Sequence, residues 1–152
     1  MSKPNPLLEQ CTESLSHTKI TVKANGRVAT FLNPGRMPIK KVDLDCWLRT
    51  TTSAKADYVI SKPGNVDIIV EIKGKDIDHA IEQILATLAL WKAVPPYSAK
   101  FGGLIVFSRS PERSATLGDV KKRLLEKHKI WLEMGKSGLK EYSFETFAIA
   151  RR

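Results

Sequence analysis

This chain of 152 residues has few cysteines, few histidines and no long apolar run. Its 2 cysteines, Cys11 and Cys46, allow one disulfide but not the framework of a small disulfide-built secreted domain. The 3 histidines are isolated and lack the spacing of zinc ligands. No segment approaches the roughly 20 apolar residues of a membrane helix, and the N-terminus lacks the apolar stretch of a signal peptide. We therefore expect a reducing, cytoplasmic location.

Acidic residues are scarce relative to basic ones. The chain has 25 Lys and Arg against 16 Asp and Glu, for a formal net charge of +9 and a pI of about 9.7. Such a surplus favours a polyanionic partner, and nucleic acid is the commonest soluble one. The alternative is that the charge serves solubility alone. The length and the 42% hydrophobic content fit a single folded domain over residues 1–152.

The pattern of the N-terminal third predicts a helix, a hairpin, a loop and a segment that fits either a strand or a short helix. Asn5-Pro6 and the helical spacing of Leu8, Cys11 and Leu15 predict a short helix to about Ser16. Asn25-Gly26, between the β-branched runs 19–24 and 27–32, predicts a β-hairpin. Residues 33–41 are predicted as a loop. Alternating apolar residues over 42–48 fit a strand or, almost as well, a short helix.

A second strand–turn–strand unit, 58–60 and 66–73, leads into a helix that Asp76 can cap and that runs to about Lys92. A strand at 103–107, a basic helix at 117–127 and two strands near 130–134 and 139–144 follow. This order predicts an α/β fold in which helices flank a mixed central β-sheet. Its core is helix, three strands, helix and strand, and a helix and two strands extend it at the C-terminus.

Charged residues end the most apolar strand. Glu71 and Lys73 are two apart, so their side chains leave the same face of the sheet. A regular hairpin would place Asp57 opposite about Ile69 and diagonal to Glu71, within reach of a shared cation. Mg²⁺ prefers such oxygen ligands and leaves its other positions to water and phosphate. The alternative is that Glu-x-Lys forms only a solvated ion pair.

The context favours the metal site. The strand before Glu71 is too apolar for an exposed edge, and Gly74 leads directly into a helix. Asp57 with Glu71-Ile72-Lys73-Gly74, and Gln83 in the next helix, resembles the PD-(D/E)XK nuclease superfamily. The match covers about 42–108, although Ala56 stands where that family often has proline.

The resemblance implies roles for these residues. Asp57, Glu71 and the backbone carbonyl of Ile72 would bind Mg²⁺ or Mn²⁺. Lys73 would be the catalytic lysine, and Gln83 would face the site, although an ordinary helix-face glutamine explains it equally well.

Many relatives add a glutamate from the first helix. The candidates here are Glu9 and Glu13, of which Glu13 is retained as a metal ligand even though both fall opposite the apolar stripe. Asp43 and Asp45 could serve instead if their segment runs beside Asp57, but they fit better as the polar side of an alternating strand.

Basic residues near these positions are candidates for phosphate contact: Lys40, Lys41, Lys75, Arg109 and Arg113. A second concentration comprises Lys121, Lys122, Arg123, Lys127 and Lys129. Together they suit sequence-independent, salt-sensitive binding.

These observations predict a metal-dependent nuclease that hydrolyses phosphodiester bonds. DNA is favoured over RNA and endonuclease over exonuclease activity. Branched DNA, or foreign DNA in a defence or mobile-element system, would be the substrate, with the protein acting as a homodimer or in a larger complex. The alternative is a catalytically silent nucleic-acid-binding or scaffold subunit with the same fold.

Overall fold

The computed structural model describes residues 6–50, 55–72, 76–94, 96–108 and 117–148. The strands in these ranges are β1 (Thr12–Leu15), β2 (Lys19–Ala24), β3 (Arg27–Leu32), β4 (Ile39–Asp43), β5 (Tyr58–Lys62), β6 (Val66–Ile72), β7 (Phe101–Phe107), β8 (Ile130–Lys136) and β9 (Glu141–Ser143). The helices are α1 (Pro6–Gln10), α2 (Leu44–Trp47), α3 (Ile77–Lys92), α4 (Leu117–His128) and α5 (Phe144–Phe147).

A six-stranded mixed sheet in the order β1-β4-β5-β6-β7-β8 forms the centre of the molecule. Its first four strands are antiparallel to their neighbours, whereas β6, β7 and β8 run parallel. Parallel neighbours need crossover connections, and α3 and α4 supply them. The predicted α/β architecture with a mixed central sheet is thereby confirmed.

A second, three-stranded sheet has the order β2-β3-β9. Its hairpin turns at Asn25 and Gly26, whose φ angles are 53° and 75°. Positive φ at both central residues is what a tight type I′ hairpin turn requires, and Asn-Gly tolerates it. The predicted hairpin is confirmed, but β9 lies parallel to β3, a long-range pairing that the local pattern did not predict.

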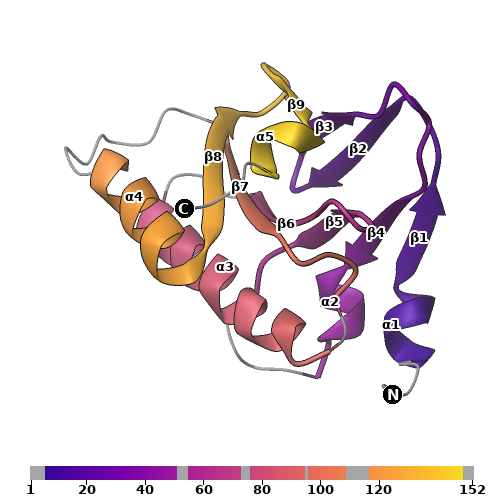
Figure 1. Ribbon diagram of the computed structural model, residues 1–152, viewed down its shortest axis with the longest axis horizontal. Coiled ribbons are helices and arrows are strands. Elements are labelled where there is room, and N and C mark those ends of the chain that lie inside the picture. Colours follow the sequence, from indigo (N-terminus) through magenta and orange to yellow (C-terminus); the bar gives the residue numbers. More distant parts are fainter. Residues whose placement is uncertain (1–5, 51–54, 73–75, 95, 109–116, 149–152) are drawn as a thin grey trace.

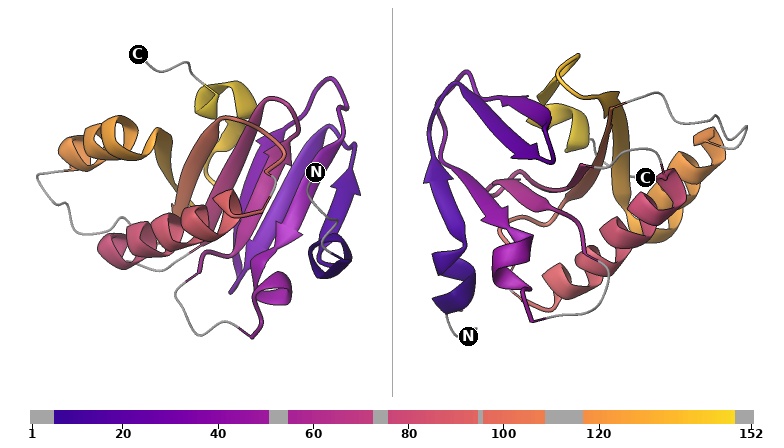
Figure 2. Two further views of the ribbon diagram at one scale, coloured as in Figure 1. Left: turned by 60° about the horizontal axis from the view of Figure 1, so that its bottom comes forward. Right: turned by 180° about the vertical axis from the view of Figure 1, so that it is seen from behind.

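Apolar side chains fill both faces of the six-stranded sheet. One core lies between this sheet and α3 with α4, and includes Val59, Ile69 and Ile84. The other lies under the small sheet and α5, and includes Ile68 and Phe31. Figures 1 and 2 show the two helices and the small sheet on opposite sides of the six strands. All seven residues of β6 are buried, as expected of a strand covered on both faces.

Several boundaries differ from the sequence prediction. The first helix ends at Gln10, and the chain continues as β1, which pairs with β4 at the sheet edge. The predicted loop 33–41 contains the start of β4, while residues 44–47 form the helix that was the alternative there. Residues 144–147 form α5 instead of extending a strand. In each case tertiary pairing or packing outweighs a short local pattern.

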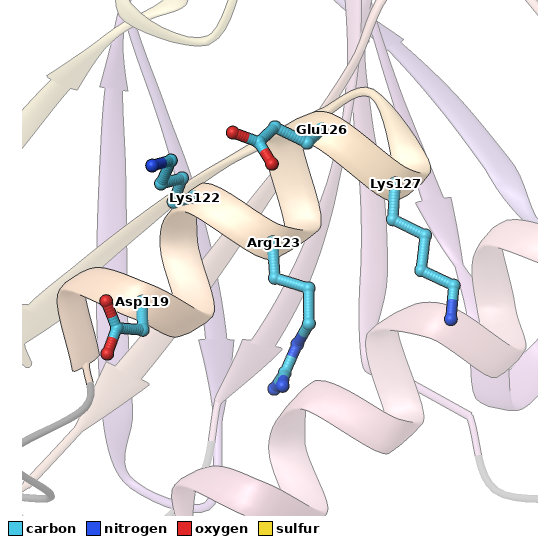
Figure 3. A pocket seen from close by; sticks show the side chains of 5 residues that line it. All are labelled: Asp119, Lys122, Arg123, Glu126 and Lys127. Atoms are coloured by element: carbon cyan, nitrogen blue, oxygen red, sulfur yellow. The ribbon is translucent and has the colours of Figure 1, made fainter.

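The two long helices match their predictions closely. Asp76 caps α3 by accepting a hydrogen bond from the backbone nitrogen of His79 at 3.0 Å. Leu124 anchors α4 in the core under α3, and the opposite face of α4 is charged (Figure 3). No helix in the described ranges is long and apolar enough to cross a membrane.

Candidate metal and phosphate site

Asp57 and Glu71 meet where β5 and β6 come together. The pairing of these strands runs to Tyr58 opposite Val70, so Asp57 and Glu71 occupy the next positions. Glu71 continues the face of Ile69, which packs under α3, whereas Asp57 lies in the bend just before β5. The expected register was therefore wrong by two residues, because Lys62 pairs with Val66 and the turn is tighter than assumed. The correction brings the carboxylates closer, from diagonal to adjacent positions.

The carboxylate of Asp57 is held against the end of β6. Its Oδ2 accepts a hydrogen bond of 2.7 Å from the backbone nitrogen of Ile72. The backbone of Asp57 is also fixed, since its nitrogen donates to the Val70 carbonyl at 3.0 Å and its carbonyl accepts from Leu44 at 3.1 Å. Asp57 thus lies beside the Glu71–Ile72 peptide with little freedom to move.

Glu71 is 1% exposed, on a strand with neighbours on both sides. Burying a carboxylate is costly unless a hydrogen bond, an ion pair or a metal compensates for lost water. Asp67, four residues earlier on the same face, provides a comparison. It is 0% exposed, and its Oδ2 accepts from Trp91 Nε1 at 2.9 Å and from the backbone nitrogen of Tyr97 at 3.0 Å, while its Oδ1 accepts from Ser61 Oγ at 2.6 Å.

Asp67 is therefore a structural carboxylate that ties β6 to the C-terminal end of α3. The sequence did not single it out, because one aspartate within an apolar run has no distinguishing neighbour. Glu71 lies at the opposite end of β6, where α3 begins, and this is the end at which the candidate site forms.

Helix α3 positions the segment that leads to Asp57. Gln83 is buried, and its Nε2 donates to the Lys55 carbonyl at 3.0 Å. Thr87, one turn later, accepts from the backbone nitrogen of Ala56 at 2.8 Å and is 0% exposed. Gln83 thus lies near the site as predicted, and its contact is with the chain that carries Asp57. Thr87 was missed, although a threonine on the apolar face of a helix is a signal that could have identified it.

The acidic side of the sheet edge also affects Tyr58. Burial raises the pKa of its phenol, and the negative charges of Asp43, Asp57, Asp45 and Glu13 raise it further. Of these, Asp43 caps α2 by accepting from the backbone nitrogen of Cys46 at 3.1 Å, and Asp45 lies 3.7 Å from Lys55. Asp43 ends β4, but Asp45 lies in α2, so the predicted alternating strand does not continue through both residues.

Glu13 does not join the site. It lies on β1 opposite Lys41, which pairs with Ile60, so its side chain leaves the face of the small-sheet core. Glu71 leaves the other face, on which Ile69 packs. The prediction of Glu13 as a metal ligand was wrong because residues 12–15 form a strand and not a continuation of the first helix.

Lys40 and Lys41 are also placed away from Glu71. Lys40 pairs with Ser61, which is opposite Asp67 at the far end of β6. Lys41 donates to the Thr21 carbonyl at 3.3 Å and lies 5.4 Å from the centre of the Tyr58 ring. The remaining predicted residues, Lys73, Lys75, Arg109 and Arg113, lie outside the described ranges.

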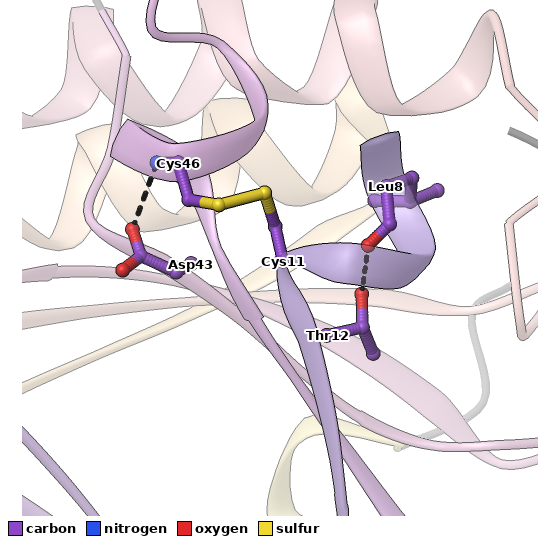
Figure 4. The surroundings of a disulfide bond; sticks show 5 residues. All are labelled: Leu8, Cys11, Thr12, Asp43 and Cys46. Carbon is purple, nitrogen blue, oxygen red and sulfur yellow. Dashed lines mark hydrogen bonds between the residues drawn. A yellow bond between two sulfur atoms is a disulfide. The ribbon is translucent and has the colours of Figure 1, made fainter. Parts of the chain in front are cut away.

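A disulfide joins Cys11 to Cys46 close to this region (Figure 4). It links the start of β1 to α2, and α2 begins at Leu44, which donates to the Asp57 carbonyl. The backbone nitrogen of Asp43 also donates to the Cys11 carbonyl at 2.9 Å. The sequence allowed this pairing without predicting it, because the two residues are separated by 35 positions.

The oxygen donors at the end of β6 fit a hard cation that needs only a few ligands from the protein. Among the described residues, no three His, Cys, Asp or Glu side chains form a group that could hold a metal. The donors predicted for such an ion are the carboxylates of Asp57 and Glu71 and the carbonyl of Ile72. Mg²⁺ is commonly held by one or two carboxylates, with water and substrate phosphate completing its octahedron. The donor set suits Mg²⁺ or Mn²⁺ and does not suit a closed structural zinc site.

Comparison of the chain with protein-family models, with curated proteins and with solved structures found no match. The resemblance to PD-(D/E)XK nucleases stays a prediction from the sequence motif.

Proposed function

We propose that this chain is a divalent-metal-dependent nuclease that hydrolyses phosphodiester bonds, with DNA favoured as substrate. One observation carries the proposal: Asp57, in the bend that precedes β5, is held against the end of β6 beside Glu71 by the hydrogen bond from the Ile72 backbone nitrogen, at the strand end where α3 begins. Two carboxylates so close repel each other, and a cation between them relieves that repulsion.

Each described residue then has a role. Asp57 and Glu71 would hold the ion with the Ile72 carbonyl, and the hydrogen bond from Ile72 to Asp57 Oδ2 keeps these groups together. Gln83 and Thr87 fix the segment before Asp57. Gln83 Oε1 is buried and has no hydrogen-bond partner among the described residues, so it can accept a hydrogen bond from a donor such as water. A bound Mg²⁺ would polarise the phosphate and lower the pKa of a coordinated water.

Two measurements test the proposal together. Supercoiled, linear, single-stranded and four-way-junction DNA, with matched RNA, are incubated in Mg²⁺, Mn²⁺ or EDTA. Asp57→Asn and Glu71→Gln each should lower cutting at least about 100-fold, or roughly 2.7 kcal/mol in barrier. Glu141→Gln is the matched control: it also neutralises a carboxylate, but on the small sheet beside Lys19.

The second measurement does not depend on turnover. Mn²⁺ should raise the thermal midpoint of the wild-type chain, because a ligand that binds only the folded state stabilises it by about 2.7 kcal/mol at 100 times its Kd. The Asp57→Asn variant should lose this rise, and Glu141→Gln should keep it. Metal-dependent cutting that survives both site substitutions would refute the site assignment.

A catalytically silent nucleic-acid-binding subunit is the second candidate. One observation favours it: Glu13 faces away, and the described residues contribute only two carboxylates to the site. This candidate predicts salt-sensitive DNA binding with no cutting of any substrate in either metal. Lys73→Ala should then leave every readout unchanged, whereas a nuclease would lose cutting.

The finer assignments belong to the same proposal. We favour internal cleavage over cleavage from ends, which closed circular DNA distinguishes because only an endonuclease can open it. We also propose a cytoplasmic location, and a homodimer or larger complex as the active form. Light scattering on the purified chain tests the dimer, and thiol trapping in cells tests the location, since a reducing compartment keeps most structural thiols free.

A further inference from the structure

The outer face of α4 carries three exposed cations: Lys122, Arg123 and Lys127. With Asp119 and Glu126 they line a hollow of about 360 Å³. Acidic and basic residues three or four apart on a helix are neighbours and can form ion pairs. Here none of the three cations forms an ion pair with any residue in the described ranges.

Several lysines elsewhere are paired with carboxylates. Lys19 lies 2.7 Å from Glu141, Lys62 lies 3.3 Å from Glu145, and Lys140 lies 3.5 Å from Glu133. The positive charges on α4 are not neutralised by neighbouring carboxylates, and they are therefore available to an external anion.

The side chains of Arg123 and Lys127 are arranged in a way that suits an anion with several charges in a row. In Figure 3, Arg123 and Lys127 project to the same side of α4, toward the neighbouring helix, whereas Lys122 and the carboxylates of Asp119 and Glu126 point elsewhere. Arg123 and Lys127 are four residues apart, so about one helical pitch of 5.4 Å separates them. Cations at such intervals can contact successive phosphates of one strand.

This face lies on the same side of the sheet as the candidate site. Leu124, on the inner face of α4, packs in the core that contains Val59 and Ile69, on the face that Glu71 continues. Figures 1 and 2 both place α4 alongside α3. Because β6 and β7 run parallel, their C-terminal ends lie at the same end of the sheet, and α3 and α4 follow these two strands in the chain.

We propose that the α4 face formed by Lys122, Arg123 and Lys127 binds the phosphate backbone of double-stranded nucleic acid outside the cleavage site. As a description of how substrate is held, this rests on the proposed nuclease function. Single strands are bound mainly by stacking on exposed aromatic rings. The only exposed large hydrophobic residues in the described ranges are Met37 and Leu139, neither of them aromatic, so a duplex is the better fit.

The test measures binding in EDTA, so that no cutting is required. Affinity of the full chain for fluorescent duplex DNA, duplex RNA and single-stranded DNA is recorded across a salt series. The variant Lys122→Gln/Arg123→Gln/Lys127→Gln is compared with a control that loses the same charge, Lys23→Gln/Arg36→Gln/Lys100→Gln. The control residues are exposed and lie outside α4: Lys23 is in β2, Arg36 is between β3 and β4, and Lys100 directly precedes β7.

For duplex DNA, each lost phosphate contact should lower the slope of log K against log salt by about 0.9, and the α4 variant should bind at least about tenfold more weakly near 0.1 M salt. The control should keep most of its affinity and slope. Equal losses in both variants would overturn the proposal in favour of net charge, and an unchanged α4 variant would overturn it directly. Weakened single-strand binding with intact duplex binding would overturn the choice of a duplex.

The outcome is separable from that of the proposed function. A wild-type chain that cuts nothing, with an α4 variant that still loses duplex binding, would refute the nuclease and support the α4 surface. A wild-type chain that cuts DNA, with an α4 variant that binds normally, would do the reverse. Circular dichroism of both variants excludes loss of fold as the cause.

Discussion

Reduction of the Cys11–Cys46 disulfide should destabilise the protein by an amount that its position predicts. The bond closes a loop with a sequence separation of 35 residues. The entropy that such a link removes from the unfolded chain is worth about 3.8 kcal/mol at 25 °C. Total stabilities of small domains are about 5–15 kcal/mol, so this is a large share.

Urea unfolding with and without reductant measures the effect. With a typical urea dependence of about 2 kcal/mol per molar, the midpoint should fall by about 2 M on reduction. The double variant Cys11→Ser/Cys46→Ser should unfold near the reduced wild type, and reductant should not shift it further. Thiol titration of the native and denatured chain records the redox state of each sample.

Two results would contradict this reasoning. A midpoint that moves by less than about 0.5 M, with both thiols titrated as free after reduction, would mean that the bond contributes little to stability. A double variant that remains sensitive to reductant would mean that another process causes the shift. Since the link braces α2 against β1, the reduced chain should also show greater protease sensitivity near α2.

Three further changes have distinct expected outcomes. Thr87→Val leaves the buried backbone nitrogen of Ala56 without its acceptor and should cost about 1–3 kcal/mol, with Thr87→Ser restoring urea resistance. Asp67→Asn replaces an acceptor of the Trp91 bond and should cost at least about 3 kcal/mol; normal thermal stability would refute its structural role. Burial raises the pKa of Tyr142 to about 12, so stability present below pH 10 should decline as pH rises from 10 to about 12. Tyr142→Phe should reduce this decline, to which Tyr58 and Tyr97 also contribute because burial raises their pKa, and an unchanged profile would contradict the assignment.

The sequence predicted elements whose signals are local. Asn25-Gly26 identified the hairpin, and Asp76 with its helical apolar pattern identified α3. The apolar run before Glu71 correctly indicated a central strand. These features depend on turn chemistry, capping and periodicity, which neighbouring residues determine.

Features that depend on distant partners were not predictable in the same way. Residues 12–15 form a strand because β4 is available to pair with them, and this pairing turns Glu13 to the wrong face for the site. Asp57 was predicted near Glu71, but in a register that was wrong by two residues. The turn between β5 and β6 is shorter than the predicted loop 61–65, and this shortening shifts the pairing. The resemblance that pointed to Asp57 and Glu71 carried no information on the contact between Thr87 and Ala56.

The parallel pairing of β3 with β9 has a consequence for the order in which the chain can fold during synthesis. β9 and α5 contribute Tyr142, Phe144 and Phe147 to the core on the small-sheet side. On a ribosome, these residues emerge long after β2 and β3. Until then the apolar face of β6 that carries Ile68 stays partly uncovered and open to chaperones. One side of the central sheet is therefore closed to water only after both the β2–β3 hairpin and the later β9–α5 segment have been synthesised.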